Sequence, residues 1–146
     1  MKVSIIIPVR NEELAVEKIV SQLENNLKNL PHEIIFINDF STDETKKKIA
    51  EISNHNNQIK VYENQRKGLG GAIVEGIDRS NGEAICIMMS DLSDNIDDFK
   101  KYYSILKDEN FDAVFGSRFI NGSKVIDYPK KKLLLNRIFN FITKLL

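Results

Sequence analysis

The chain has one cysteine, no tryptophan and no excess of charge of either sign. A single cysteine excludes an internal disulfide framework and any zinc site that needs several thiolates. The 21 basic and 21 acidic residues balance, which excludes a globally basic nucleic-acid binder, so we expect no nucleic-acid partner. The remaining composition, 42% hydrophobic and 29% charged in 146 residues, is typical of a domain with a packed core.

Long hydrophobic runs are also missing. The apolar stretch 4–9 is too short for a secretory signal, and charged residues from Arg10 onward replace the small residues of a cleavage site. The stretch 133–146 carries polar residues and falls short of the ~20 residues that a membrane-spanning helix needs. We therefore expect a cytoplasmic protein, peripheral on the cytoplasmic face of a membrane if its C-terminal segment binds lipid.

Apolar runs and amphipathic windows alternate along the chain. We expect strands at 3–9, 33–38, 59–63, 84–89 and 113–115, and helices at about 16–30, 41–52, 72–78 and after the acidic stretch 91–98. Ser41 and Glu44 form a predicted capping box at the start of the second helix. This alternation predicts an α/β fold with a mostly parallel, doubly wound sheet and helices on both faces.

Polar and glycine-rich stretches follow the predicted strands. They lie at 8–12, 38–41, 66–71, 89–94 and 116–118. Because ligands of such sheets bind at the carboxyl ends of the strands, we expect these stretches to build one site.

The loop Gly68-Leu69-Gly70-Gly71 is a candidate phosphate loop. Ile73 stands where a dinucleotide fingerprint requires its third glycine, and the loop follows the third strand rather than the first, which argues against NAD. Two interpretations stay open, a tight turn into a helix and direct contact with a phosphate. Arg66 and Lys67, just before the loop, favour attraction of a diphosphate.

Carboxylates follow the second and fourth predicted strands. Asp39 can accept two hydrogen bonds from the amide or imide edge of a nucleobase, although a lone acid there is also typical of a helix cap. In the acidic stretch, Asp97 and Asp98 fit a helix start, whose dipole favours negative charge. Asp91 lies directly at the strand end, and we assign it to a divalent cation and leave Asp94 open.

Five motifs in order resemble the family 2 inverting glycosyltransferases, and among them the polyprenyl-phosphate (dolichol-phosphate mannose synthase-like) sugar synthases. Residues 3–12 (VSIIIPVRNE) are similar to the family's VSVVIPxYNE, 37–45 (INDFSTDET) to VDDGSxDGT, and 68–76 (GLGGAIVEG) to GLGxAxxxG. Residues 88–94 (MMSDLSD) resemble MDADLSD, and 116–119 match GSRF. Each motif alone is weak, but the series covers most of the chain.

The resemblance implies a GT-A (Rossmann-like) fold, a UDP- or GDP-linked sugar donor and a polyprenyl phosphate acceptor. It implies that the donor-binding residues are Pro8, Arg10, Glu12, Asp39, Lys67 and Gly70. It also implies a catalytic pair in which Asp91 binds Mg²⁺ or Mn²⁺ and Arg118 meets a phosphate.

Four positions depart from the family pattern. Arg10 replaces a tyrosine, Asn38 replaces the first acid of an aspartate pair, and Phe40 replaces a glycine. Met89 stands where the first acid of Asp-x-Asp is expected. Because one carboxylate gives a hard cation few ligands, Met89 argues against tight metal binding.

The implied reaction needs no general base. A phosphate monoester carries between one and two negative charges at neutral pH, so its oxygen is already a nucleophile. The protein has to position the reactants and to neutralise the diphosphate leaving group. Asp91, through a cation, and Arg118, on one of the phosphates, can do both.

A run of three lysines, 130–132, precedes an apolar segment whose polar residues fall on one helical stripe. A basic lead-in and an amphipathic helix are typical of an interfacial helix and predict binding to an anionic membrane surface. The alternative is a helix that packs on the sheet or on a second subunit, which keeps a homo-oligomer open. We divide the chain into a nucleotide-sugar-binding domain at 1–122 and a basic, amphipathic segment at 123–146, which is a minimal or truncated form of the family's C-terminal part.

Two other functions stay open. A family 2 transferase with a saccharide acceptor needs a base to deprotonate a hydroxyl, and Asp127 is the only acid beyond Arg118 in the sequence. A catalytically degenerate nucleotide-binding or scaffold domain is favoured by Met89 and opposed by the presence of Asp39, Asp91 and Arg118. The sequence identifies neither the sugar, the base nor the length of the lipid.

Overall fold

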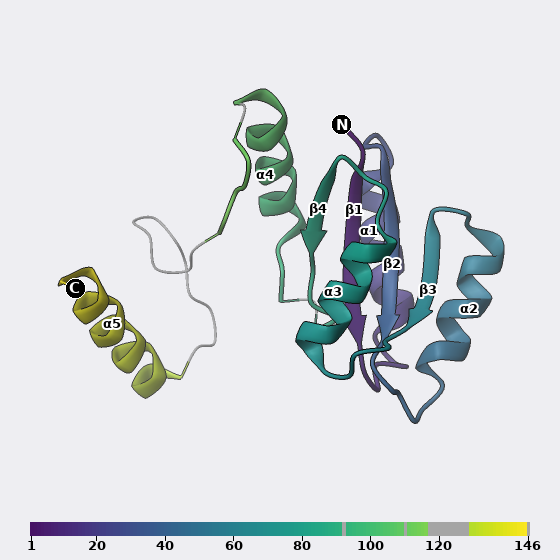
Figure 1. Cartoon of the computed structure of the whole chain (residues 1–146), viewed down its shortest axis with the longest axis horizontal. Helices are drawn as coiled ribbons and strands as arrows, with labels where there is room; N and C mark the ends of the chain where they lie inside the picture. The colour runs from purple at the N-terminus through teal and green to yellow at the C-terminus, as the bar shows by residue number, and fades with distance from the viewer. Residues whose placement is uncertain (92, 110, 117–128, 146) are drawn as a thin grey trace.

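The computed structural model of the chain describes residues 1–91, 93–109, 111–116 and 129–145 (Figure 1). The strands are β1 (Val3–Val9), β2 (His32–Asn38), β3 (Ile59–Glu63) and β4 (Ala84–Ile87). The helices are α1 (Val16–Leu27), α2 (Thr45–His55), α3 (Leu69–Arg79), α4 (Ile96–Asp108) and α5 (Lys130–Leu145). Strands and helices alternate from β1 to α4, which confirms the predicted α/β order.

The four strands form a parallel sheet in the order β3-β2-β1-β4. The chain runs outward from β1 to β2 and β3, and β4 then returns to the other side of β1. The strand order therefore reverses between β1 and β4, and the carboxyl ends of strands at such a switch point are the usual place for a ligand.

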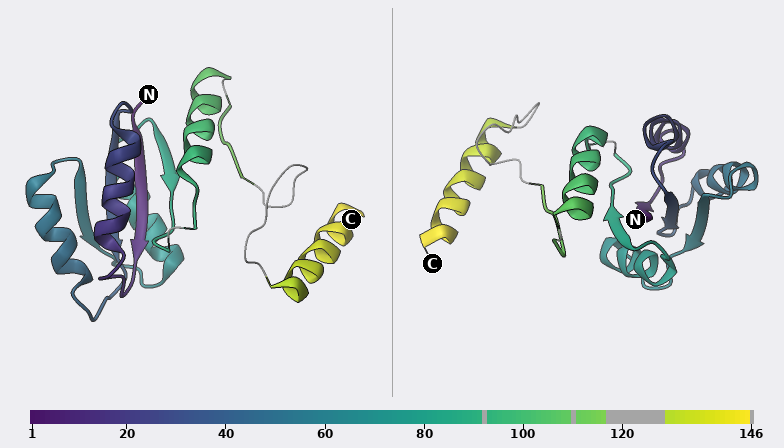
Figure 2. Two further views of the ribbon diagram at one scale, coloured as in Figure 1. Left: turned by 180° about the vertical axis from the view of Figure 1, so that it is seen from behind. Right: turned by 90° about the horizontal axis from the view of Figure 1, so that it is seen from above.

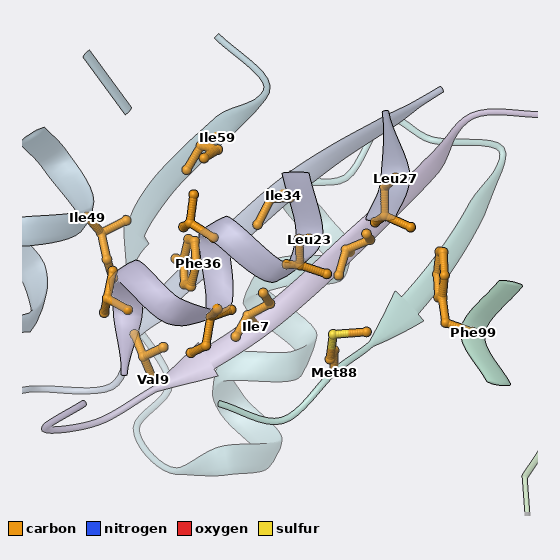
Figure 3. Packing of buried hydrophobic residues seen from close by; sticks show 14 of the residues in the cluster. Ile7, Val9, Leu23, Leu27, Ile34, Phe36, Ile49, Ile59, Met88 and Phe99 are labelled. Carbon is orange, nitrogen blue, oxygen red and sulfur yellow. The ribbon is translucent and has the colours of Figure 1, made fainter. Parts of the chain in front are cut away.

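Helices cover both faces of the sheet (Figure 2). On one face, Ile7 of β1 and Phe36 of β2 pack with Leu23 of α1 and Ile49 of α2 (Figure 3). On the other face, Ile6, Ile35 and Ile37 pack against Ala72 of α3. Because β1 and β2 are buried on both faces, their sequences are continuous apolar runs rather than alternating ones.

The strand β4 ends at Ile87, two residues before its predicted end. Its last ladder bond on the β1 side joins Met88 N to Ile6 O. Pro8 is the next residue of β1 that faces β4, and its nitrogen has no hydrogen to donate. The ladder therefore stops at Pro8, and the last register pair between β1 and β4 is Ile6 with Ile87.

Two further local predictions are wrong. The expected strand 113–115 is irregular, and its Phe115 side chain is 90% exposed, so it gains no burial that would hold it in a ladder. The capping box does not form either, because Ser41 Oγ accepts from Asn11 N instead. Asp43 Oδ1 accepts from Thr45 N at 3.0 Å and takes over the start of α2.

The helix α4 begins as the acidic stretch predicts. Asn95 Oδ1 accepts from Asp97 N at 2.8 Å, and Asp97 and Asp98 lie in the first turn. Phe99 is buried with Met88 against the α1 face of the sheet. The loop between β4 and α4 is thus anchored at both ends.

The helix α5 lies away from the sheet in every view (Figures 1 and 2). Five of its large apolar side chains are 48–65% exposed, namely Leu134, Leu135, Ile138, Phe139 and Ile142. None of the helices in the described ranges combines the length and the hydropathy that crossing a membrane requires. The apolar face of α5 is therefore open to a partner or a surface.

Candidate functional site

Hydrogen bonds from side chains connect the loop after β1 to the loop after β2. Asn11 N donates to Ser41 Oγ at 3.0 Å, and Thr42 N donates to Asn11 Oδ1 at 2.8 Å. Glu12 N donates to Thr45 Oγ1 at 2.8 Å. The two loops therefore form one unit at the carboxyl edge of the sheet, and this unit holds Glu12 beside the start of α2.

Further hydrogen bonds between the same two loops involve three acidic residues, Glu13, Asp43 and Glu44. Glu13 N donates to Asp43 Oδ2 at 3.2 Å, and Glu44 N donates to Glu13 Oε2 at 2.9 Å. Partial desolvation raises the pKa of Asp43, but hydrogen bonds from Thr45 and Glu13 outweigh it and lower that pKa below its usual value. The carboxylates of Glu13 and Asp43 therefore accept from backbone amides of the loops, whereas the Glu44 carboxylate pairs with Lys47 at 2.6 Å.

Three non-glycine residues in the described part of the chain have positive φ, and each follows a strand. They are Asn11 (φ 56°) after β1, Phe40 (φ 56°) after β2 and Lys67 (φ 51°) after β3. Left-handed backbone is costly for a side chain as large as that of Phe40, which stands where the resembling family has a glycine. Backbone strain of this kind gathers at functional sites, and here it marks the predicted edge.

Asp39 lies directly after β2 and is only 6% exposed. Its Oδ1 accepts from Asn64 Nδ2 at 2.7 Å and from Gly68 N at 2.8 Å. Among the residues that the structure describes, none donates a hydrogen bond to its other carboxylate oxygen, Oδ2. Asp39 therefore ties β2 to the glycine loop through one carboxylate oxygen.

The glycine loop, residues 68–71, makes a tight turn into α3, which is one of the two roles that the sequence left open for it. Gly68 has φ 85° and ψ 165°, which only glycine adopts without strain, and it is the N-cap of α3. A Cβ built at Gly70 meets nothing within 4 Å, so packing does not require glycine there. The first turn of α3 thus has open space beside it, and the exposed Lys67 precedes it.

Arg66 does not face this space. Its Nη2 donates to Asp78 Oδ2 at 2.7 Å, and its Nη1 lies 3.7 Å from Glu75 Oε2. Both acids lie in the second half of α3, so the guanidinium is drawn away from the helix start. The prediction that Arg66 attracts a diphosphate is not supported by this geometry.

The end of β1 meets the segment after β4 at the switch point. Ser90, 7% exposed, donates from Oγ to Glu12 Oε1 at 3.4 Å. Pro8 is buried in β1, whereas Arg10 is exposed and makes no ion pair with any residue in the described ranges. Pro8, Glu12 and Asp39 are thus brought to one edge of the sheet.

The predicted metal residue, Asp91, is exposed in the segment after β4. Its Oδ1 accepts from Ser93 N at 2.9 Å, and Asp94 Oδ2 accepts from Met89 N at 2.8 Å. The described ranges contain no group of three or more metal-ligating side chains. A donor set of this kind suits Mg²⁺ that is held by one carboxylate and by phosphates of a ligand, and does not suit an all-protein cage.

The single cysteine, Cys86, lies in β4, shortly before this segment in the sequence. Burial, together with the negative charge of Asp94, raises the pKa of Cys86 to about 11. A thiol with that pKa is protonated at neutral pH and is neither a good nucleophile nor a ready metal ligand.

Two sequence predictions fall outside the described residues. Arg118, the second member of the predicted catalytic pair, lies within 117–128. So does the predicted domain boundary between 122 and 123.

The residues that sequence reasoning missed are those that hold the site together, Asn11, Ser41, Thr45, Asn64 and Ser90. Their common signal is a small polar side chain within a few residues of a strand end, where Asx- and Ser/Thr-type hydrogen bonds to backbone are frequent. That signal is local, whereas their partners lie in other loops, so the sequence offered no way to pair them.

Comparison with known proteins gives concordant results. The family model described as "Glycosyl transferase family 2" matches residues 4–146. Among curated proteins, the chain is similar to a dolichol-phosphate mannosyltransferase of Pyrococcus furiosus, with 31% identity over 94% of this chain and 39% of that protein.

Solved structures agree. S. aureus TarS in complex with UDP-GlcNAc has a TM-score of 0.58 and 25% identity over 86% of this chain and 37% of that one. A mannosyl-3-phosphoglycerate synthase from Rubrobacter xylanophilus shares the fold, with a TM-score of 0.55 and 21% identity over 65% of this chain and 32% of that one. The chain spans less than half the length of each of these three proteins.

Proposed function

This chain belongs to glycosyl transferase family 2 and has its GT-A fold, and we propose that it transfers a sugar from a nucleoside diphosphate to a polyprenyl phosphate at a membrane surface, with inversion. The observation that carries the proposal is the buried carboxylate of Asp39, held at the carboxyl edge with one oxygen that no neighbouring donor occupies in the described ranges. Such a group is suited to a donor N–H of a nucleobase.

The donor would lie across the switch point. Pro8, Glu12 and Asp39 would line the nucleoside, and the UDP-GlcNAc bound by S. aureus TarS supports a nucleotide-sugar of this type. Arg10 and Lys67 are exposed cations at the same edge and would attract the diphosphate. The open space at Gly70 would admit it to the first turn of α3.

A divalent cation, Mg²⁺ or Mn²⁺, fits Asp91 as its protein ligand, with donor phosphates and water completing the coordination. When bound, it would supply positive charge to the leaving diphosphate. Arg118, the other member of the predicted catalytic pair, would add a second positive charge. Through that cation, Asp91 would keep the diphosphate end of the donor beside the end of β4.

The transfer step balances without a base. A phosphate oxygen of the acceptor forms a bond to the anomeric carbon while the bond from that carbon to the diphosphate breaks, and the nucleoside diphosphate leaves with the electron pair. Attack from the face opposite the leaving group inverts the configuration. The half-buried Cys86 thiol is not needed, in keeping with its raised pKa.

The acceptor assignment is supported by two observations. The relative from Pyrococcus furiosus is a dolichol-phosphate mannosyltransferase. The helix α5 presents an exposed apolar face, and Lys131 and Lys132 at its start are exposed. This combination fits the interface of an anionic membrane, so we assign 1–122 to the donor and 123–146 to the membrane, at its cytoplasmic face.

A second candidate is a catalytically degenerate nucleotide-binding domain. Met89, 37% exposed, occupies the place of the first metal acid, and its backbone N–H is held by Asp94. In this arrangement a nucleotide-sugar would bind, but no cation would be held to neutralise the diphosphate as it leaves, so no transfer would follow.

Incubation of the protein with UDP- or GDP-sugars, a polyprenyl phosphate and Mg²⁺ or Mn²⁺ tests the proposal. Formation of a sugar-phosphate lipid, with release of one nucleoside diphosphate for each sugar transferred, is expected. Transfer to a saccharide but not to the lipid phosphate would contradict the acceptor. Donor binding without any turnover would favour the degenerate domain.

A further inference from the structure

We infer that the side chain of Phe40 is the surface on which the base of the donor nucleotide stacks. The inference rests on the proposed function and adds to it a binding residue at a position where the resembling family has a glycine. It applies to any nucleobase, because each has a flat π-face that an aromatic ring can cover. The place of Phe40 in its loop, its exposure and its backbone conformation support it.

Phe40 lies between Asp39 and the loop after β1. On one side of it, Asp39 N donates to Val9 O at 2.8 Å. On the other side, Asn11 N donates to Ser41 Oγ at 3.0 Å. These two contacts fix residue 40 beside the end of β1, and β1 is the strand that separates β2 from β4 in the sheet. A donor that lies across the switch point therefore passes Phe40.

Phe40 also has the one free aromatic ring at this edge. Its side chain is 51% exposed, which is ordinary for a single apolar residue and becomes informative only through its place. The polar and glycine-rich stretches 8–12, 38–41, 66–71 and 89–94 contain no other aromatic residue in their sequences. Tyr62, near the end of β3, is already covered, because Arg79 Cζ lies 4.9 Å from the centroid of its ring.

The backbone of Phe40 is in the left-handed region, with φ 56°. A large side chain is disfavoured there because its Cβ crowds the following carbonyl oxygen, and glycine avoids this cost. Ser41 N donates to Asn38 Oδ1 at 3.3 Å, which holds the turn across residue 40 without using the ring. The turn therefore does not require phenylalanine, and strain that the fold does not need points to a ligand.

Stacking on Phe40 and hydrogen bonding to Asp39 act on different parts of a base. A carboxylate accepts from an N–H in the plane of the base, whereas an aromatic ring covers its face. The two interactions are therefore compatible in one complex. Loss of the ring should weaken the binding of a nucleoside diphosphate about tenfold.

Fluorescence tests the contact directly. The chain has no tryptophan, so Phe40→Trp creates a protein with a single indole at the proposed site. Phe111→Trp is the matched control, because Phe111 is 54% exposed and follows α4. The second half of α4 lies beside the amino end of β1, since Tyr103 Oη donates to Met1 O at 2.8 Å. Saturation with UDP or GDP in Mg²⁺ should quench the emission of Phe40→Trp and leave that of Phe111→Trp unchanged.

Titration calorimetry of the whole chain with UDP, GDP and pyrophosphate in Mg²⁺ supplies a second measurement. Phe40→Gly should weaken each nucleoside diphosphate that the wild type binds about tenfold, and should leave the affinity of pyrophosphate, which has no base, unchanged. Because glycine relieves the left-handed strain, this variant without ligand should unfold at the same or a higher temperature than the wild type. Phe111→Gly should change none of the affinities.

Each outcome has a distinct meaning. Emission of Phe40→Trp that nucleotide binding does not change, or wild-type UDP and GDP affinities in Phe40→Gly, overturns the inference and leaves the transferase proposal intact. Equal weakening of UDP and pyrophosphate also overturns it, because the loop rather than the base would then be affected. If neither UDP nor GDP binds the wild-type protein, the proposed function fails as well. The calorimetric series decides the question even where the tryptophan variant does not fold.

Discussion

Glu33 Oε2 accepts a hydrogen bond from Lys60 Nζ at 2.8 Å, across β2 and β3 on the sheet face that α3 covers. Glu33 is 2% exposed, and its Oε1 also accepts from Ser4 Oγ at 2.7 Å and from Asn81 N at 3.0 Å. The charge is therefore buried but fully paired. It joins three strands near the end of the sheet opposite the proposed site.

This cluster predicts a dependence of stability on pH. Burial raises the pKa of Glu33, but hydrogen bonds from Lys60, Ser4 and Asn81 outweigh it and lower the pKa from 4.5 to about 2. Because the folded pKa is depressed, the carboxylate stabilises the fold above pH ~4.5, and this contribution is lost as the pH falls towards ~2.

Glu33→Gln should lower the free energy of unfolding at pH 7 by on the order of 2 kcal/mol, and by less at pH 3. Urea denaturation at both pH values measures this. Glu83→Gln is the control, because Glu83 lies at the same end of the sheet but is 71% exposed and should change stability little. A Glu33→Gln effect that is equal at pH 7 and pH 3 would contradict the assigned pKa.

The metal proposal predicts opposite effects for two neighbouring positions. Asp91→Asn should abolish the part of UDP binding that depends on Mn²⁺. Met89→Asp should tighten that part, by about tenfold, because it adds a second hard ligand at an exposed position. Calorimetric titrations with and without Mn²⁺ distinguish the two. If Met89→Asp leaves the Mn²⁺ dependence unchanged, residue 89 does not face the cation.

The membrane proposal predicts a role for the lysines at 130–132. Each charge near an anionic surface is worth about 1 kcal/mol, so changing all three to glutamine should weaken binding to phosphatidylserine vesicles about a hundredfold at low salt. Cosedimentation measures this, and binding should also fall as salt rises. UDP affinity should stay the same, since the donor edge does not include these residues.

The chain contains a matched control for this experiment. The run Lys46–Lys48 in α2 has the same composition, but Lys46 pairs with Glu63 at 2.8 Å and Lys47 with Glu44 at 2.6 Å. Changing that run to glutamine removes the same net charge and should affect vesicle binding much less. Equal losses for both runs, or no binding of the wild-type protein, would contradict a specific role for α5.

The parts of the fold that depend on local pattern were predictable from the sequence. The apolar runs of β1 and β2 and the acidic first turn of α4 are such cases, because burial on both faces and the helix dipole act within a few residues. The end of β4 was not predictable, because Pro8 limits it from a neighbouring strand far away in sequence. The strand expected at 113–115 had the right composition but has no ladder partner in the described structure.

The candidate site shows the same division. Asp39, Glu12 and Asp91 could be identified from their motifs, each directly after a strand. That Asp39 has one oxygen left for a ligand depends on Asn64, which lies 25 residues further along the chain. The diversion of Arg66 towards Glu75 and Asp78 depends on how α3 is placed on the sheet. Such partnerships arise from tertiary structure and leave no mark in a single sequence.

The most direct test of the account is the affinity of UDP for the wild-type protein and for Asp39→Ala, measured by titration calorimetry in Mg²⁺. Loss of the Asp39 carboxylate should weaken binding by about 1–3 kcal/mol, whereas Asp108→Ala, an exposed acid at the end of α4, should not change it. An Asp39→Ala protein that is folded and binds UDP as tightly as the wild type would contradict a donor site at the carboxyl edge of β2.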